Sequence, residues 1–252
     1  MRRRLARWTV ASQAMSARGR VTLRSVLGRF LQVAWRSVAA RRYARGHRQW
    51  RAKWAELDFA PSWRITSPSQ LPRELIEAVE TSWFPAGASL LDIGCGSGEI
   101  AAWLAARGYD VLGVDYAEPA VVSARSRYGS GGGRLRFETV DICSDVPLEM
   151  RFQSLFDRGC FHAIPPAFAV DYVRNIASYS AIGARLLLLC GTQCGNAWGT
   201  SHRELADVVM HLFQGTFDVV RVEPTSIERS SGPKPEAPLP AIAAWMIRRD
   251  LT

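Results

Sequence analysis

The sequence predicts an α/β protein with an open, seven-stranded, mostly parallel sheet, helices on both faces and an antiparallel last strand. Short apolar runs alternate along the chain with segments of helical periodicity. A glycine-rich turn connects the first apolar run to a helix-like segment, and helical patterns stop before the last two runs. The 252 residues are enough for one such domain with an N-terminal extension.

Strands are expected where β-branched and other apolar residues form short runs bounded by turn residues. These runs are residues 89–94, 110–115, 134–140, 153–157, 184–190, 217–223 and 241–248. Helices are expected at residues 99–107, 118–127, 169–180 and 201–213, after a helix-like segment at residues 72–81. Strands that alternate with helices of this length form a parallel sheet covered on both faces. A polar, proline-containing loop at residues 225–240 separates the last two strands, which predicts a hairpin and an antiparallel last strand.

Three alternating glycines follow the first strand, in a turn whose key residues are Asp92, Gly94, Cys95, Gly96 and Gly98. Glycines let the backbone turn tightly and approach a ligand, and the helix that begins after the turn presents unpaired N–H groups. Dinucleotide-binding turns follow the pattern G-x-G-x-x-G, whereas the spacing here is G-x-G-x-G. An acid ahead of the first glycine would repel a pyrophosphate, but it can contact an ammonium group.

Acidic residues also stand at the ends of the next three strands, at Asp115, Asp141 and Asp157. Ligands of open α/β sheets bind beyond the carboxyl ends of the strands, so these side chains are expected around one site. Asp115 is placed to accept both hydroxyls of a ribose. Each acid alone is also a common turn former or helix cap, but together they occur at successive strand ends.

These motifs resemble the first motifs of class I S-adenosylmethionine-dependent methyltransferases. The resemblance implies a Rossmann-like fold and S-adenosyl-L-methionine as the co-substrate, with S-adenosyl-L-homocysteine as the product. It implies that the glycine turn and Asp92 contact the methionine end of the donor, and that Tyr116 stacks near the adenine. Asp141 is expected to accept the adenine amine, and the backbone N–H at Ile142 to reach a ring nitrogen. Asp157 is expected beside the donor, where donor and acceptor meet.

The segment after the fourth strand narrows the resemblance to one group of these methyltransferases. The sequence Asp157-Arg158-Gly159, followed by an aromatic residue, His162 and prolines, resembles the thiol, thiopurine and halide methyltransferases. The short Pro-x-Trp sequence that ends at Trp63 looks like the segment that closes over the donor in that group. The chain departs from the group at Ala169, near which related proteins often carry an arginine. The resemblance implies methyl transfer to a small molecule, at sulfur first and at oxygen next.

The candidate catalytic residues are His162, Asp157 and Arg158. Methyl transfer mainly requires that nucleophile, methyl group and sulfur are aligned and that water is excluded. A thiolate needs no strong base, whereas a phenol or an alcohol would benefit from His162, because an imidazole titrates near neutral pH. The alternative for His162 is a satisfied, partly buried histidine. Arg158 either steers an anionic acceptor or pairs with Asp157, and both interpretations stay open at the level of sequence.

The basic residues are concentrated at the N-terminus. Residues 1–55 contain 15 Arg and Lys and no Asp or Glu, whereas residues 56–252 are mildly acidic. Apolar residues recur at helical spacing over residues 23–38, with arginines on the opposite side. We therefore expect a basic, amphipathic helical extension at residues 1–55 and the methyltransferase domain at residues 56–252.

The extension has four possible roles: binding to an anionic membrane surface, binding to nucleic acid, organellar targeting, or packing on the domain. Two alternative functions follow from the first two roles. One is a membrane-associated methyltransferase of a lipid-like or natural-product acceptor, and the other is a nucleic-acid-binding or RNA-modifying protein. Nucleic acid is the less favoured partner, because the positive charge is confined to one terminus.

The five cysteines lack the spacing of a zinc site, so no metal is expected. A reducing, cytoplasmic compartment is favoured, with peripheral membrane attachment or an organelle as alternatives. No apolar run approaches the roughly 20 residues that a membrane-spanning helix needs. The identity of the acceptor and the oligomeric state have no recognisable code in the sequence.

Overall fold

The computed structural model of the protein describes a little under three quarters of the chain. The described residues are 40–41, 43–56, 59, 61–129, 133–144, 148, 150–192, 201–229 and 236–250. Contacts divide the chain into two compact units, residues 1–38 and residues 39–252. The amphipathic helix predicted at residues 23–38 lies outside the described residues. Residues 43–55, which the sequence analysis assigned to the extension, are helical and share the second unit with the domain.

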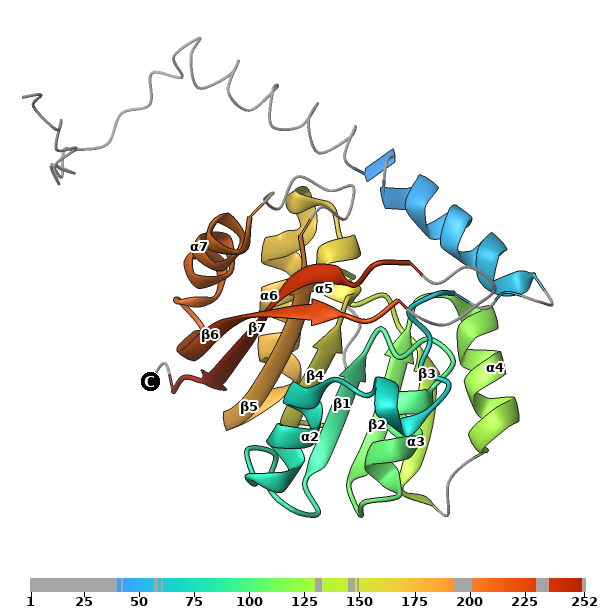
Figure 1. Ribbon diagram of the computed structural model, residues 1–252, viewed down its shortest axis with the longest axis horizontal. Helices are drawn as coiled ribbons and strands as arrows, with labels where there is room; N and C mark the ends of the chain where they lie inside the picture. Colours follow the sequence, from blue (N-terminus) through green and yellow to red (C-terminus); the bar gives the residue numbers. More distant parts are fainter. Residues whose placement is uncertain are drawn as a thin grey trace, which may run out of the picture. The chain divides into compact units, whose positions relative to one another are not determined.

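Seven strands form one sheet in the order β3-β2-β1-β4-β5-β7-β6 (Figure 1). The strands are β1 (Ser89–Ile93), β2 (Asp110–Asp115), β3 (Leu135–Thr139), β4 (Phe152–Arg158), β5 (Ser180–Gly191), β6 (Phe217–Ile227) and β7 (Leu239–Arg248). All pairs from β3 to β5 are parallel, and β7 runs antiparallel to both β5 and β6. The predicted mostly parallel sheet with an antiparallel last strand is therefore confirmed.

The last two strands are longer than predicted. The β6–β7 hairpin pairs continuously from Phe217 with Arg248 to Ile227 with Leu239, with one register shift between Val219 and Arg221. Part of the polar segment expected as loop thus extends the ladder, because backbone hydrogen bonds continue wherever two strands stay adjacent. Strand β5 also begins earlier than expected, at Ser180.

Helices cover both faces of the sheet, as predicted. They are α2 (Arg73–Glu80), α3 (Glu99–Ala105), α4 (Glu118–Tyr128), α5 (Cys160–Ala163), α6 (Ala169–Tyr179) and α7 (His202–Phe213), with short 3-10 turns η1 (Pro68–Gln70) and η3 (Pro166–Phe168). One buried cluster contains residues of α2, α3 and α4, and the other contains residues of α5, α6 and α7. Neighbouring residues of β1 divide between them: Leu90 belongs to the first cluster and Leu91 to the second, as the alternation of a strand requires.

The carboxyl ends of β1, β2 and β4 meet at one edge of the sheet. Strand β1 lies between the other two, with Ile93 opposite Val114 of β2 and opposite Asp157 of β4. The acids predicted at the strand ends are therefore brought to a common edge, although they are separated by tens of residues in the sequence. Among the described residues, each helix is too short or too polar to cross a bilayer.

Candidate active site

The glycine turn follows β1 and has a backbone that only glycine adopts readily. Gly94, Gly96 and Gly98 have φ angles of +72°, +53° and +85°. The N–H groups at Gly94 and Cys95 both donate to the carbonyl oxygen of Val114, at 2.8 and 2.9 Å, which ties the turn to β2. A Cβ atom on Gly98 would lie 2.7 Å from the Phe137 ring. The turn is therefore tied to β2, and the Phe137 ring of β3 leaves no room for a side chain at Gly98.

Asp115 stabilises the same turn from the end of β2. Its Oδ2 atom accepts from the Gly96 N–H at 3.1 Å, and its Oδ1 atom accepts from the Ala117 N–H at 2.8 Å. Burial raises the pKa of Asp115 to about 6, while these backbone hydrogen bonds act to lower it. Each carboxylate oxygen retains acceptor capacity, so the side chain can hold the turn and still receive hydroxyl groups of a ligand.

The Asp92 carboxylate is buried, and hydrogen bonds only partly compensate the loss of its hydration. Its side chain is 3% exposed, and its Oδ2 atom has no hydrogen-bond partner among the described residues. Burial, together with the negative charges of Asp157 and Asp115, raises the pKa of Asp92 to about 8. A backbone hydrogen bond from Ala101 lowers it only in part. A cation at this oxygen would remove the imbalance.

Asp157 is the penultimate residue of β4 and contacts helix α6. It accepts hydrogen bonds from the Tyr172 hydroxyl at 2.6 Å, from the Cys160 N–H at 2.8 Å and from the Phe161 N–H at 3.0 Å. Burial raises the pKa of Asp157 to about 7, and these bonds oppose the rise. The geometry makes Asp157 an anchor for the short helix α5, which carries Cys160 and His162 at the edge of the sheet.

Arg158 does not pair with Asp157, because consecutive residues of a strand point to opposite faces. Its Nη1 atom donates to the Trp63 carbonyl at 3.0 Å, and its Nη2 atom donates to the Glu228 carbonyl at 3.2 Å. Its buried Nε–H has no partner in the described part of the chain. Burial lowers the pKa of Arg158 to about 10, so the side chain stays positively charged at neutral pH. Pairing with Asp157, one of the two sequence interpretations, is therefore wrong.

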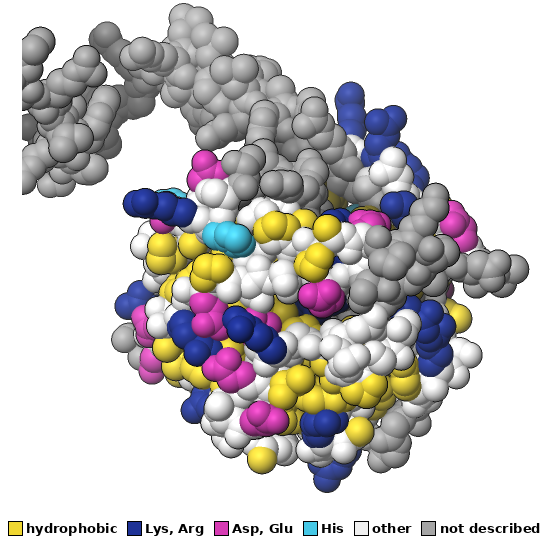
Figure 2. Space-filling model, in the orientation of Figure 1, with side chains coloured by type: hydrophobic (Ala, Val, Ile, Leu, Met, Phe, Trp, Pro, Cys, Tyr) yellow, Lys and Arg dark blue, Asp and Glu magenta, His cyan; other side chains and the backbone are white. Residues whose placement is uncertain are grey.

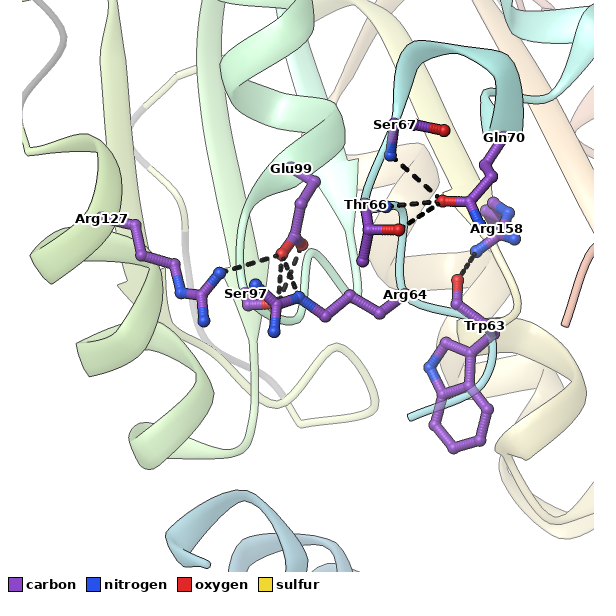
Figure 3. Close-up of polar contacts among 9 residues, drawn as sticks. All are labelled: Trp63, Arg64, Thr66, Ser67, Gln70, Ser97, Glu99, Arg127 and Arg158. Carbon is purple, nitrogen blue, oxygen red and sulfur yellow. Dashed lines mark hydrogen bonds and ion pairs between the residues drawn. The ribbon is translucent and has the colours of Figure 1, made fainter. Parts of the chain in front are cut away.

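A polar network that the sequence analysis missed joins the segment after Trp63 to helix α3 (Figure 3). The Arg64 Nε–H donates to the Glu99 carboxylate at 2.8 Å, and the Ser97 hydroxyl donates to the same carboxylate at 2.8 Å. Arg127 of α4 approaches Glu99 to within 3.6 Å. The only local signal for this network was the position of Arg64 directly after Trp63 and of Glu99 directly after the glycine turn.

His162 is held as a neutral hydrogen-bonding group. The Gly191 N–H donates to its Nδ1 atom at 2.8 Å, so the ring proton is assigned to Nε2. Burial, with a smaller contribution from the charge of Arg158, lowers the pKa of His162 to about 4. This environment disfavours the predicted role as a general base, because the basic nitrogen is already occupied and the cation is destabilised.

Asp141 and Tyr116 are covered by the helical residues 43–55. The Tyr43 hydroxyl donates to Oδ1 of Asp141 at 2.5 Å, and Nε2 of His47 lies 3.8 Å from Oδ2. The His47 ring stacks on Tyr116, with centroids 4.0 Å apart and an angle of 14° between the planes. Neither Tyr43 nor His47 was predicted from the sequence as a residue of the site.

Ile142 follows Asp141 and is buried, and its carbonyl accepts from the Asn175 side chain at 2.9 Å. The expected pairing of the Asp141 carboxylate and the Ile142 backbone N–H with an adenine stays a prediction. The described residues contain no cluster of three or more His, Cys, Asp or Glu side chains that could hold a metal ion.

Residues 90–181 match the family model of a methyltransferase domain. The 2-heptyl-1-hydroxyquinolin-4(1H)-one methyltransferase of Mycobacteroides abscessus is 29% identical over 53% of this chain, and the match spans 57% of that protein. The demethylmenaquinone methyltransferase of Thermus thermophilus is 28% identical over 69% of this chain and 81% of its own length. The N-methyltransferase NodS of Bradyrhizobium japonicum, solved with S-adenosyl-L-homocysteine, has the same fold, with a TM-score of 0.59 and 14% identity over 81% of this chain and 99% of NodS.

The matched residues 90–181 contain the glycine turn and the strand ends that carry acids, and the sheet has the fold of the solved methyltransferase NodS. The narrower resemblance to the thiol, thiopurine and halide methyltransferases stays a prediction.

Asp92→Asn should stabilise the ligand-free protein increasingly as the pH rises from 4 to 8. The folded-state pKa of Asp92 is raised to about 8, above the value of about 3.9 for an unfolded aspartate. Stability from this group is therefore present at low pH and is lost as the pH rises through that interval. Since each unit of pKa shift corresponds to about 1.4 kcal/mol, we expect a gain of about 5 kcal/mol at pH 8 and under about 1 kcal/mol at pH 4, measured by urea unfolding. The control is Asp110→Asn, a half-exposed acid at the start of β2, which should have the same stability as the wild type. Equal stability of Asp92→Asn and wild type at pH 8 would contradict the raised pKa of Asp92.

Proposed function

We propose that the protein transfers a methyl group from S-adenosyl-L-methionine to a small-molecule acceptor, at sulfur first and at oxygen next. One observation carries the donor part of the proposal: two buried polar groups without partners lie on one face of neighbouring strands. They are Oδ2 of Asp92 and Nε of Arg158. Asp92 is in register with Phe156, and Arg158 follows Phe156 by two residues, so both side chains are on the same face of the sheet.

A ligand with an ammonium group and a carboxylate on one carbon would satisfy both groups. Buried polar groups without partners are costly, and buried charges are normally paired. The amino-acid end of S-adenosylmethionine has this chemistry, with the ammonium for Asp92 and the carboxylate for Arg158. The glycine turn beside Asp92 would then leave its backbone close to the donor.

The nucleoside end would be bound along the same edge, as the sequence predicts. Asp115 would accept the ribose hydroxyls from the end of β2, and Tyr116 would contact the adenine ring. Asp141 and the N–H of Ile142 would bind the polar edge of the adenine. Trp63 would lie over the donor, in a segment held by the hydrogen bond from Arg158 to its carbonyl.

The chemistry of the site favours an acceptor that supplies its own anionic or soft nucleophile. In methyl transfer, a lone pair of the acceptor forms a bond to the methyl carbon as the carbon–sulfonium bond breaks, and its electrons neutralise the donor sulfur. His162 has its basic nitrogen occupied by the Gly191 N–H, and burial raises the pKa of the Cys160 thiol well above its usual value. With no accessible base among these residues, a thiolate is better suited than an alcohol.

Asp115→Ala should weaken binding of S-adenosyl-L-homocysteine by about a hundredfold or more, because it removes the acceptor of a charge-assisted pair of hydroxyl bonds and loosens the glycine turn. Isothermal titration calorimetry of the full chain measures this change. The matched control is Asp110→Ala, at the opposite end of the same strand, which should bind like the wild type. A wild-type protein that binds neither S-adenosylmethionine nor its demethylated product would overturn the proposed function.

The pH dependence of turnover should follow the pKa of the acceptor thiol and not the pKa of a protein side chain. With thiophenol, an acidic thiol, kcat/KM should level off at lower pH than with benzyl mercaptan, a weakly acidic thiol, because only the thiolate reacts. His162→Gln should leave both midpoints unchanged. One common midpoint for the two thiols, lost in His162→Gln, would instead show that His162 is the base. A screen that includes halides, phenols and lipid extracts identifies the acceptor class.

A second candidate function is methylation of a hydrophobic acceptor at an anionic membrane surface. The helical residues 40–41 and 43–55 carry exposed cations, visible as the dark blue group at the upper right of Figure 2. They are Arg41, Arg45, Arg48, Arg51 and Lys53. Two relatives are named for acceptors with apolar parts, a heptyl quinolone and demethylmenaquinone. Basic residues near an anionic surface each contribute about 1 kcal/mol of attraction.

The full chain should sediment with vesicles that contain phosphatidylserine and not with pure phosphatidylcholine vesicles, and high salt should release it. The double variant Arg45→Glu and Arg48→Glu should weaken sedimentation by about tenfold or more. Arg203→Glu, an exposed charge reversal at the start of α7, serves as the control. Sedimentation that ignores lipid charge would refute this candidate, and tighter binding to RNA than to vesicles would favour the nucleic-acid alternative.

A further inference from the structure

One face of the helical residues 43–55 contacts the proposed nucleoside site. Tyr43, His47, Trp50 and Trp54 recur at helical spacing, and we call them the inner face. Figure 1 shows this helix, in blue, beyond the arrowheads of the parallel strands. The exposed arginines and the lysine of the same helix are on its other sides. The helix therefore has one side directed at the domain and another directed at solvent.

The first contact of the inner face is with Asp141. Oδ1 of Asp141 accepts two hydrogen bonds, from the Tyr43 hydroxyl at 2.5 Å and from the Cys143 N–H at 3.0 Å. Oδ2 faces Nε2 of His47 at 3.8 Å. Tyr43 also stacks on Phe168, with ring centroids 4.4 Å apart. Tyr43 and His47 thus approach both oxygens of the carboxylate.

The remaining contacts cover the neighbouring elements. His47 stacks on Tyr116, and Trp54 lies against Gly96, where a Cβ atom would come within 3.2 Å of its ring. Trp50 meets Trp63 edge to face, with centroids 5.6 Å apart. The inner face therefore touches four of the residues that we propose for donor binding: Gly96, Tyr116, Asp141 and Trp63.

These contacts compete with an adenine ring. An amine that binds Asp141 needs a carboxylate oxygen with free acceptor capacity in the right direction, and Tyr43 and His47 approach both oxygens. A ring that stacks on Tyr116 from the side of His47 would meet the imidazole at van der Waals distance. The helix and the nucleoside thus use the same carboxylate, and one must yield when the other binds.

We propose that the helix of residues 43–55 is a latch, held on Asp141 by Tyr43 and His47, that closes the nucleoside half of the donor site until the donor displaces it. The inference rests on the proposed function, because it takes Asp141 and Tyr116 as nucleoside contacts. It adds two residues, Tyr43 and His47, that control access of the donor.

The contacts that hold the helix of residues 43–55 on the domain are weak enough to break reversibly. None of the described residues 43–55 is fully buried, and the ion pair of Arg51 with Glu118, at 3.8 Å, joins two exposed side chains. Such surface pairs contribute little to stability. The hydrogen bond from Tyr43 to a carboxylate is the strongest single polar contact of the inner face, so its loss should shift the equilibrium toward the open helix.

Tyr43→Phe tests the latch, because it removes the hydroxyl and keeps the ring on Phe168. We expect S-adenosyl-L-homocysteine to bind about fivefold more tightly to this variant than to the wild type, since less of the protein is closed. Gln49→Ala, an exposed position on the same helix, should bind like the wild type. Unchanged or weaker binding by Tyr43→Phe would overturn the latch and would make Tyr43 a supporting wall of the site.

A second measurement needs no donor. Backbone amides of residues 43–55 should exchange with deuterium several times faster in Tyr43→Phe than in the wild type and in Gln49→Ala. Equal exchange in all three proteins would show that the contact with Asp141 does not hold the helix, and would overturn the latch while leaving the proposed function intact. Faster exchange in Tyr43→Phe, with no binding of the homocysteine product by any protein, would instead overturn donor gating together with the proposed function.

Discussion

Buried negative charge at the carboxyl edge of the sheet is the constraint on which the site depends. Asp92, Asp115 and Asp157 lie at the ends of three adjacent strands, and burial raises the pKa of each above the usual range of an aspartate. The charges of Asp115 and Asp157 contribute to the raised pKa of Asp92. Backbone N–H groups and a tyrosine neutralise this charge only in part. A ligand that brings positive charge would complete the balance, and S-adenosylmethionine carries both an ammonium and a sulfonium.

The three carboxylates have different hydrogen-bond partners and therefore different roles. The Asp157 oxygens accept hydrogen bonds from Tyr172 and from the backbone of α5, so Asp157 supports the helix that carries His162. Asp115 supports the glycine turn from the side of β2. Asp92 alone retains an oxygen without a partner among the described residues. Asp157 lies on the opposite face of the sheet from Asp92, and Asp92 is left as the acid with an oxygen that could receive a cation.

The N-terminal helix links access to the site with the surface of the molecule. Its inner face contacts Asp141, Tyr116 and Gly96, while its outer positions carry cations. Any partner that attracts the outer face acts on the same rigid element that covers the nucleoside half of the site. An anionic surface and the donor would then bias one helix from two sides, which is the requirement for coupling between two binding events.

The sequence by itself determined the alternation of strands and helices, the glycine turn after β1, the acids at the strand ends and the antiparallel last strand. These are local properties, since periodic burial and backbone conformation are encoded within a few neighbouring residues. Only the tertiary structure decided that Tyr43 meets Asp141, 98 residues away, that Asp157 faces Tyr172, and that Arg158 bonds to the carbonyl of Trp63 instead of to Asp157. Those contacts depend on the strand order and on which face each residue occupies at the edge of the sheet, and no local pattern records which distant segments become neighbours there.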